Sequence, residues 1–186
     1  AFWQANYNQL VNLFPEFKDV SVDELVSMIN KTECALIRTE ADELTYPLHI
    51  MVRYEIEKEI AKGNIDYDKL PELWADKYEE YLGVRPANYK EGILQDMHWS
   101  TGYLGYFPTY ALGSAYAAQL YATMEKQFDV EEALLTNHFE KITDWLKENV
   151  HHYAASKSMA EIVEEVSGEL VIAKHMRICL LYTSPS

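Results

Sequence analysis

Residues 92–110 read GILQDMHWSTGYLGYFPTY, and the rest of the chain is expected to be organised around this stretch. It holds an amide, a carboxylate, an imidazole, an indole and three phenols. That is more hydrogen-bonding and proton-transfer capacity than a hydrophobic core requires. Gly102 and Gly105 leave the backbone open to close approach by another group. We therefore predict that these side chains line one side of a functional site. The apolar helix that the pattern indicates over residues 109–128 would hold them in place.

The composition is that of an acidic globular protein. Its 186 residues are enough for one domain with a sizeable core, and 48% of them are apolar. Asp and Glu number 30 against 16 Lys and Arg, so the net charge is −14 and a nucleic-acid partner is not expected. No apolar run is long enough to cross a membrane, and Cys34 and Cys179 have no metal or redox spacing. We expect a cytoplasmic protein in a reducing compartment.

Hydrophobic periodicity predicts an all-α fold with at most a small β element. The expected helices cover residues 1–14, 21–30, 42–62, 68–82, 109–128, 131–149 and 158–166. The stretch from Cys34 to Thr39 is short and partly β-like, which allows one edge strand. Ser21 and Glu24 have the spacing of a capping box.

The helix predicted over residues 42–62 carries the most regular apolar face. The positions that recur at helical spacing include Leu44, Leu48, Met51, Val52, Ile56 and Ile60. The glutamate-rich run over residues 55–59 is interpreted as a solvated face. Gly63 is expected to end this helix.

Arg38 lies just before this helix, at the junction with the possible strand. Its planar fork of N–H groups is suited to a carboxylate ligand. A structural salt bridge to Asp42 or Glu43 is the alternative, and spacing alone favours it.

His98 is the second candidate functional residue. A lone histidine is more often a satisfied structural group than a catalytic one. With Gln95 and Asp96 just before it, and with tyrosines at 103, 106 and 110 able to donate to an oxyanion, the two interpretations are evenly balanced. Aromatic packing at a helix entry is the alternative for the tyrosines.

The chain contains no metal-ligand spacing. There is no HExxH or CxxC motif. His151 and His152 are adjacent and would point apart, and His49 has no partner histidine four residues on. We expect no metal ligands in this sequence.

Two motifs carry a family resemblance. Residues 37–42, IRTEAD, match I-R-x-x-A-D, and residues 92–99, GILQDMHW, match G-x-x-Q-D-x-H-W in full. In this order they resemble the signature motifs of the carboxypeptidase Taq family of metallocarboxypeptidases. The similarity runs from about residue 1 to about residue 177.

The resemblance implies a gluzincin-type helical fold split by a deep substrate groove. Such an enzyme removes C-terminal amino acids from peptides with one divalent metal, zinc or cobalt, and it is often a homodimer. Its metal ligands and its general-base glutamate come from an HExxH helix and a downstream glutamate, which this sequence lacks. We therefore expect residues 1–177 to be the C-terminal part of the catalytic domain, inactive alone, with residues 178–186 a non-native tail.

The resemblance also assigns roles to individual residues. Arg38 would bind the carboxylate at the substrate's C-terminus, and Asp42 would hold Arg38 or the nearby backbone. His98, with either Tyr106 or Tyr110, would contact the substrate carbonyl or the tetrahedral intermediate.

Gln95 and Asp96 would orient the side chains of His98 and the tyrosine.

A hypothesis of another class is a non-catalytic, acidic helical interaction module. The negative net charge and the absence of metal ligands suggest it.

Overall fold

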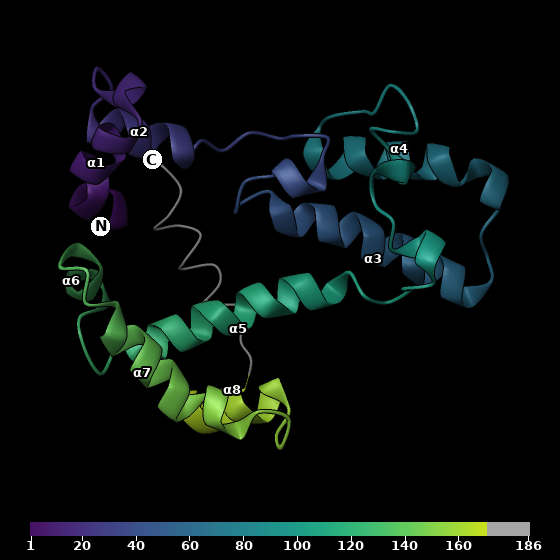
Figure 1. Cartoon of the computed structure of the whole chain (residues 1–186). Coiled ribbons are helices and arrows are strands. Elements are labelled where there is room, and N and C mark those ends of the chain that lie inside the picture. Colours follow the sequence, from purple (N-terminus) through teal and green to yellow (C-terminus); the bar gives the residue numbers. More distant parts are fainter. Residues whose placement is uncertain (171–186) are drawn as a thin grey trace. The chain divides into compact units, whose positions relative to one another are not determined.

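A computed structural model describes residues 1–170, and this part of the chain is helical, without a strand (Figure 1). The α-helices are α1 (Phe2–Leu13), α2 (Val22–Ile29), α3 (Tyr46–Lys62), α4 (Leu70–Leu82), α5 (Pro108–Met124), α6 (Val130–Leu135), α7 (Phe139–Asn149) and α8 (Met159–Ser167). Short 3₁₀ helices connect them: η1 (Pro15–Phe17), η2 (Arg38–Glu40), η3 (Tyr67–Lys69), η4 (Ile93–Gln95), η5 (Trp99–Thr101) and η6 (His151–Tyr153). The all-α prediction is confirmed. No helix among the described residues is long and apolar enough to cross a membrane.

The described chain divides into two compact units, Lys31–Gly113 and a second unit made of Ala1–Asn30 and residues 114–170. We call them the central unit and the outer unit, after their places in the sequence: the first is its middle segment, and the second is made of the segments on either side. The central unit contains both sequence motifs. Each unit has its own hydrophobic core.

In the central unit, α3 and α4 lie side by side as a helical hairpin (Figure 1). Its core is formed by Val52, Ile56, Trp74, Tyr78 and Leu82. Gly63 ends α3 in the left-handed conformation, with φ of 70°, as glycine permits. Gly83 ends α4 in the same way. Tightly packed helices on a short connection give the candidate site a rigid base.

In the outer unit, the C-terminal half of α5 packs with α6, α7 and α8. Its core is formed by Leu120, Met124, Val130, Trp145 and Val163. The predicted capping box at Ser21 and Glu24 begins α2, and Ser158 and Glu161 form a second one at α8. Local signals therefore set where α2 and α8 begin.

Three predicted elements differ from the structure. The stretch from Cys34 to Thr39 is not a strand, because the chain turns into η2 at Arg38. The helix predicted from residue 42 begins at Tyr46, because the Asp42 carboxylate accepts hydrogen bonds from the N–H groups of Leu44 and Thr45 and holds a turn.

The helix predicted over residues 131–149 is two helices, α6 and α7. The chain breaks between them where Asn137 has φ of 57°, a left-handed conformation that asparagine tolerates better than most residues. The predicted non-native tail, with Cys179, lies outside the described residues.

Candidate functional site

One stripe of α3 forms the floor of the candidate site. His49, Arg53 and Glu57 recur every fourth residue, and so they share one face of the helix. His49 and Arg53 are fully buried, and Glu57 is 7% exposed. The apolar face predicted for this helix is buried at Val52 and Ile56, whereas Met51, and Leu44 just before the helix, are exposed. The buried surface of α3 therefore has two parts, an apolar one that contributes to the core and this polar stripe, which contributes to the site.

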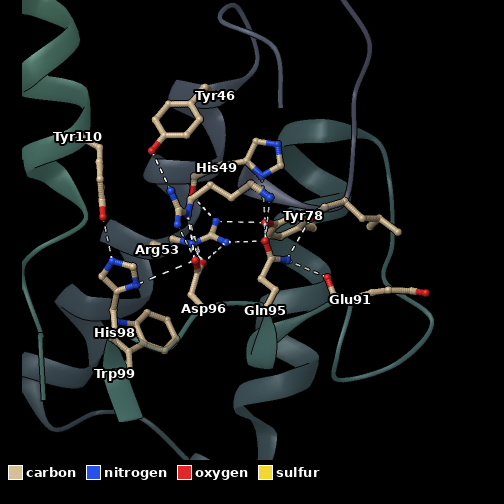
Figure 2. Close-up of polar contacts among 12 residues, drawn as sticks. Tyr46, His49, Arg53, Tyr78, Glu91, Gln95, Asp96, His98, Trp99 and Tyr110 are labelled. Atoms are coloured by element: carbon tan, nitrogen blue, oxygen red, sulfur yellow. Dashed lines mark hydrogen bonds and ion pairs between the residues drawn. The ribbon is translucent and has the colours of Figure 1, made fainter. Parts of the chain in front are cut away.

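Asp96 lies between the guanidinium groups of Arg38 and Arg53. Figure 2 shows Asp96 beside Arg53. Arg38 donates to Asp96 Oδ1 from Nη2 at 2.7 Å and from Nε at 3.1 Å. Arg53 donates to Oδ2 from Nε at 2.7 Å, and its Nη2 lies 2.6 Å from the same oxygen. The side chains of Arg38 and Asp96 are each 8% exposed. Two cations thus share one carboxylate, and this ion-paired group carries one excess positive charge.

Gln95 links the motif at residues 92–99 to the motif at residues 37–42. Its Oε1 accepts a hydrogen bond from the backbone N–H of Arg38 at 2.9 Å and from Nη2 of Arg53 at 2.8 Å. Its Nε2 donates to the carbonyl of Leu36 at 3.0 Å and to that of Glu91 at 2.8 Å. Gln95 therefore fixes both the backbone of Arg38 and the buried arginine behind it.

Aromatic rings surround the guanidinium of Arg38. Its Cζ lies 5.1–5.8 Å from the ring centres of Tyr46, Phe107 and Tyr110. Nη1 donates to the Tyr46 hydroxyl at 2.9 Å. The guanidinium has five N–H groups, and three of them are used: the one on Nε, one on Nη1 and one on Nη2. The second N–H of Nη1 and the second N–H of Nη2 have no partner among residues 1–170. N–H groups of one guanidinium that remain available in this way can donate to a carboxylate ligand.

The charges of Arg38 and Asp96 stabilise each other. Burial works against ionisation of Asp96, but hydrogen bonds and charge from Arg38 and Arg53 outweigh it and lower its pKa. Burial likewise opposes the charge of Arg38, but Asp96 and Tyr46 outweigh it and raise its pKa. Both groups are charged at neutral pH.

The neighbours of Arg53 on the buried side are neutral. Arg53 Nη1 donates to the His49 carbonyl at 2.7 Å and to the Tyr78 hydroxyl at 3.1 Å. Burial, with the charges of Arg53 and Arg38, lowers the pKa of His49 to about 4. Burial raises the pKa of Tyr78. Neither side chain adds charge near pH 7.

His98 pairs with a tyrosine on the other side of Asp96 (Figure 2). Its Nε2 lies 3.0 Å from the Tyr110 hydroxyl. Its Nδ1 is buried, lies 4.0 Å from Asp96 Oδ1 and has no hydrogen-bond partner within residues 1–170. The ring of Tyr106 lies 5.8 Å from that of His98 and 5.5 Å from that of Tyr110. Tyr106 is 44% exposed, and its hydroxyl makes no hydrogen bond with the described residues.

Glu57 fixes the segment that carries His98 and Tyr106. One carboxylate oxygen, Oε1, accepts from the indole N–H of Trp99 at 2.8 Å and from the backbone N–H of Gly105 at 2.9 Å. These contacts hold the two ends of a loop that has little regular structure of its own. The interpretation of residues 55–59 as a solvated face is therefore wrong for Glu57.

The structure brings together Arg38, Gln95, Asp96, His98 and Tyr110, with Tyr106 at the edge. The alternative partners predicted for Arg38, Asp42 and Glu43, are not the ones that it uses. Asp42 holds backbone instead: it accepts from the N–H groups of Thr45, Leu44 and Glu33 at 2.9–3.1 Å. Burial opposes ionisation of Asp42, but these bonds outweigh it and lower its pKa.

Sequence reasoning missed two residues, Arg53 and Glu57. The spacing of His49, Arg53 and Glu57 was a usable signal, because three polar residues at intervals of four define one helix face. That face was hidden by the competing apolar periodicity of the same helix.

The candidate site contains no metal centre of its own. Within residues 1–170, no group of three or more His, Cys, Asp or Glu side chains is placed to hold a metal ion. The polar cluster is suited to binding an anion and to proton transfer.

Known proteins give an independent assignment. The family model for carboxypeptidase Taq (M32) metallopeptidases matches residues 1–180. Carboxypeptidase 1 of Bacillus subtilis is 45% identical over 177 residues, 94% of this chain and 35% of that protein. Thermostable carboxypeptidase 1 of Thermus thermophilus is 39% identical over 175 residues, 94% of this chain and 34% of that protein.

Solved structures agree. The carboxypeptidase of Pyrococcus furiosus superposes with a TM-score of 0.94 at 35% identity, covering 97% of this chain and 37% of that one. Metallocarboxypeptidase 1 of Trypanosoma cruzi gives a TM-score of 0.92 at 35% identity, over 98% of this chain and 38% of that one. The chain thus spans about a third of the length of the relatives it matches. By motif, by family match and by structure, this chain belongs to the carboxypeptidase Taq (M32) metallopeptidase family.

Proposed function

We propose that the central unit forms the part of a metal-dependent carboxypeptidase that receives the C-terminal carboxylate of a peptide substrate. One observation carries the proposal: two guanidiniums share the single carboxylate of Asp96, and the more exposed one, Arg38, keeps two N–H groups without a partner among residues 1–170. A substrate carboxylate would neutralise the excess charge and occupy both donors. Internal peptide bonds offer no such anion, so this contact would select for removal of the last residue.

The side chains of His98, Tyr106 and Tyr110 would act on the scissile carbonyl. Tyr106, exposed and without a hydrogen-bond partner among the described residues, is the phenol best placed to donate to a developing oxyanion. His98 would orient Tyr110 through the 3.0 Å contact between its Nε2 and the Tyr110 hydroxyl, and would so hold this side of the site in place. Asp96 and Gln95 would hold Arg38, and Asp42 would hold the turn that leads into α3.

The divalent metal implied by the family, zinc or cobalt, does not fit residues 1–170, because these residues contain no group suited to hold it. None of the steps assigned to this chain passes through it. We expect the chain of 186 residues alone to hydrolyse no peptide. Homodimer formation, which the family resemblance implies, is likewise proposed for the full-length protein.

The test uses the chain joined to the remaining length that its relatives have. Arg38→Ala is compared with wild type on a blocked dipeptide with a free C-terminal carboxylate. Loss of the carboxylate contact should lower kcat/KM by roughly 10- to 150-fold, equivalent to about 1.5–3 kcal/mol. Arg85→Ala is the matched control, since Arg85 lies at the surface with Asp76, Glu79 and Glu72.

A second substrate separates recognition from general damage. The C-terminal amide of the same dipeptide lacks the anion, so Arg38→Ala should lower the preference for acid over amide. A loss of no more than twofold on the free acid would refute the assignment of Arg38. Hydrolysis of neither substrate by the metal-loaded wild type would favour the non-catalytic interaction module.

A further inference from the structure

Among residues 1–170, Arg53 is the charged side chain that has no exposed surface. It is 0% exposed, and all its partners lie in the central unit. Burying a guanidinium costs free energy unless its hydrogen bonds and charge are satisfied, and lysine or arginine is rarely found fully buried. Packing alone therefore does not explain why a guanidinium is buried behind Asp96.

The Arg38–Asp96 pair by itself would be a poor anion receptor. A guanidinium in a bidentate contact with a carboxylate is a neutral unit, and its positive charge is already matched. The second guanidinium changes this balance. Arg53 binds Asp96 Oδ2 from two nitrogens, at 2.6 and 2.7 Å, so the one negative charge is divided between two cations.

We propose that Arg53 supplies the charge, and Arg38 the contact, that make this cluster a receptor for a carboxylate. The inference rests on the proposed function, and it assigns Arg53 as a positioning residue that never touches the ligand. Arg53 lies outside both sequence motifs. Arg53 has no exposed surface and Arg38 keeps 7% of its own, so Arg38 is the cation of the pair that a ligand can contact.

The other ionisable groups nearby do not cancel this charge by ion pairing. The Asp42 carboxylate is occupied by backbone N–H groups, and Glu57 by Trp99 and Gly105. Among the described residues, neither carboxylate forms an ion pair with a guanidinium of the cluster. His49 and Tyr78 are neutral near pH 7 for the reasons given above. The ion-paired set therefore holds two positive charges and one negative charge.

The test measures anion binding directly, in the complete protein freed of metal, with N-acetylalanine as the probe in titration calorimetry. Arg53→Gln removes the inner charge and should weaken binding about tenfold or more, as expected for one unit charge in a partly buried site. Arg53→Gln with Asp96→Asn restores one net positive charge, and its affinity should return to within about threefold of wild type. Arg85→Gln should leave binding unchanged.

The outcomes separate the two proposals. If Arg38→Gln abolishes binding while Arg53→Gln leaves it unchanged, the proposed function stands and this inference fails. If Arg38→Gln also leaves binding unchanged, the proposed function itself fails. If Arg53→Gln weakens binding and the double variant does not recover, Arg53 acts through structure alone and the charge assignment is overturned.

One further variant, Arg53→Lys, together with the double variant, keeps the test decisive should Arg53→Gln not fold, as judged by its thermal melt. Arg53→Lys and the double variant both keep one net positive charge, although they differ in geometry. Arg53→Lys is expected to bind N-acetylalanine within about fivefold of wild type, and the double variant within about threefold. A loss of more than tenfold in both folded proteins would overturn the inference.

Discussion

The central and outer units are stabilised in different ways. The central unit buries ionisable groups: Arg38, Arg53, His49 and Glu57. Among the described residues of the outer unit, the buried polar side chains are the neutral ones of Gln119 and Thr123, and the ion pair between Lys157 and Glu165 lies near the surface. A buried ion pair is seldom more stabilising than the apolar residues that could replace it. The charges in the central unit are therefore better explained by function than by stability, and four substitution or titration experiments can test that contrast.

The largest effect is expected at Asp96. Asp96→Ala would leave two guanidiniums close together without their shared carboxylate, at a cost of about 3–5 kcal/mol in the free energy of unfolding. Urea unfolding followed by tryptophan fluorescence measures it, since Trp74 and Trp99 lie in the central unit.

The same substitution in the outer unit provides the control. Asp129 accepts a hydrogen bond from the N–H of Glu132 and caps α6, so Asp129→Ala should cost about 1 kcal/mol. Equal costs at Asp96 and Asp129 would remove the contrast between the units.

The second-largest effect is a pH dependence of the free energy of unfolding, which we attribute to His49. Its pKa in the folded protein is about 4, below the ordinary 6.5. Above pH 6.5 the ring is neutral in both states. As pH falls from 6.5 to 4, only the unfolded chain takes up the proton, so stability should fall by about 3 kcal/mol in total.

Unfolding free energies at several pH values between 4 and 7 would show this slope. His49→Gln removes the titrating group, and the difference between the two curves isolates its contribution. If both proteins lose stability equally over this range, His49 is not the group responsible.

A smaller effect is expected at Glu57. In Glu57→Gln an amide still accepts from Trp99 and Gly105, but a neutral acceptor is weaker and a buried NH₂ gains no partner. The cost should be about 1–2 kcal/mol, with faster hydrogen exchange at the Gly105 amide. Glu164→Gln, at an exposed position of α8, should change stability by less than about 0.5 kcal/mol. Unchanged exchange at Gly105 would show that Glu57 does not hold the loop.

The smallest effect concerns the outer unit and has the opposite sign. Ala154 has φ of 45° and ψ of −121°, a conformation that favours glycine. Ala154→Gly should therefore raise stability by about 1 kcal/mol. Ala160→Gly, inside α8, should lower it by a similar amount, because glycine is a poor helix former. If both substitutions destabilise, the turn at Ala154 is not strained.

The features that could be predicted from sequence are those with local causes. Capping boxes, the glycine at the end of α3 and the all-α class each depend on residues within a few positions of one another. The two motifs were found because their residues are adjacent in sequence. The break at Asn137 was missed because no proline or glycine marks it.

The candidate site was predicted only in part, because its contacts are distant in sequence. Arg38 was expected to pair with a carboxylate a few residues away, but its partner is Asp96, 58 positions on. Arg53 meets Asp96 across 43 positions. A pairing of this kind depends on how η2, α3 and η4 pack, and no short-range pattern contains that information.

The three polar residues of α3 also limit how the gene can change. His49, Arg53 and Glu57 serve three different parts of the site from one helical stripe. One codon inserted after Ile50 would turn the later two by about 100° relative to the first. Length variation inside this helix should therefore be purged far more strictly than substitution at its exposed positions.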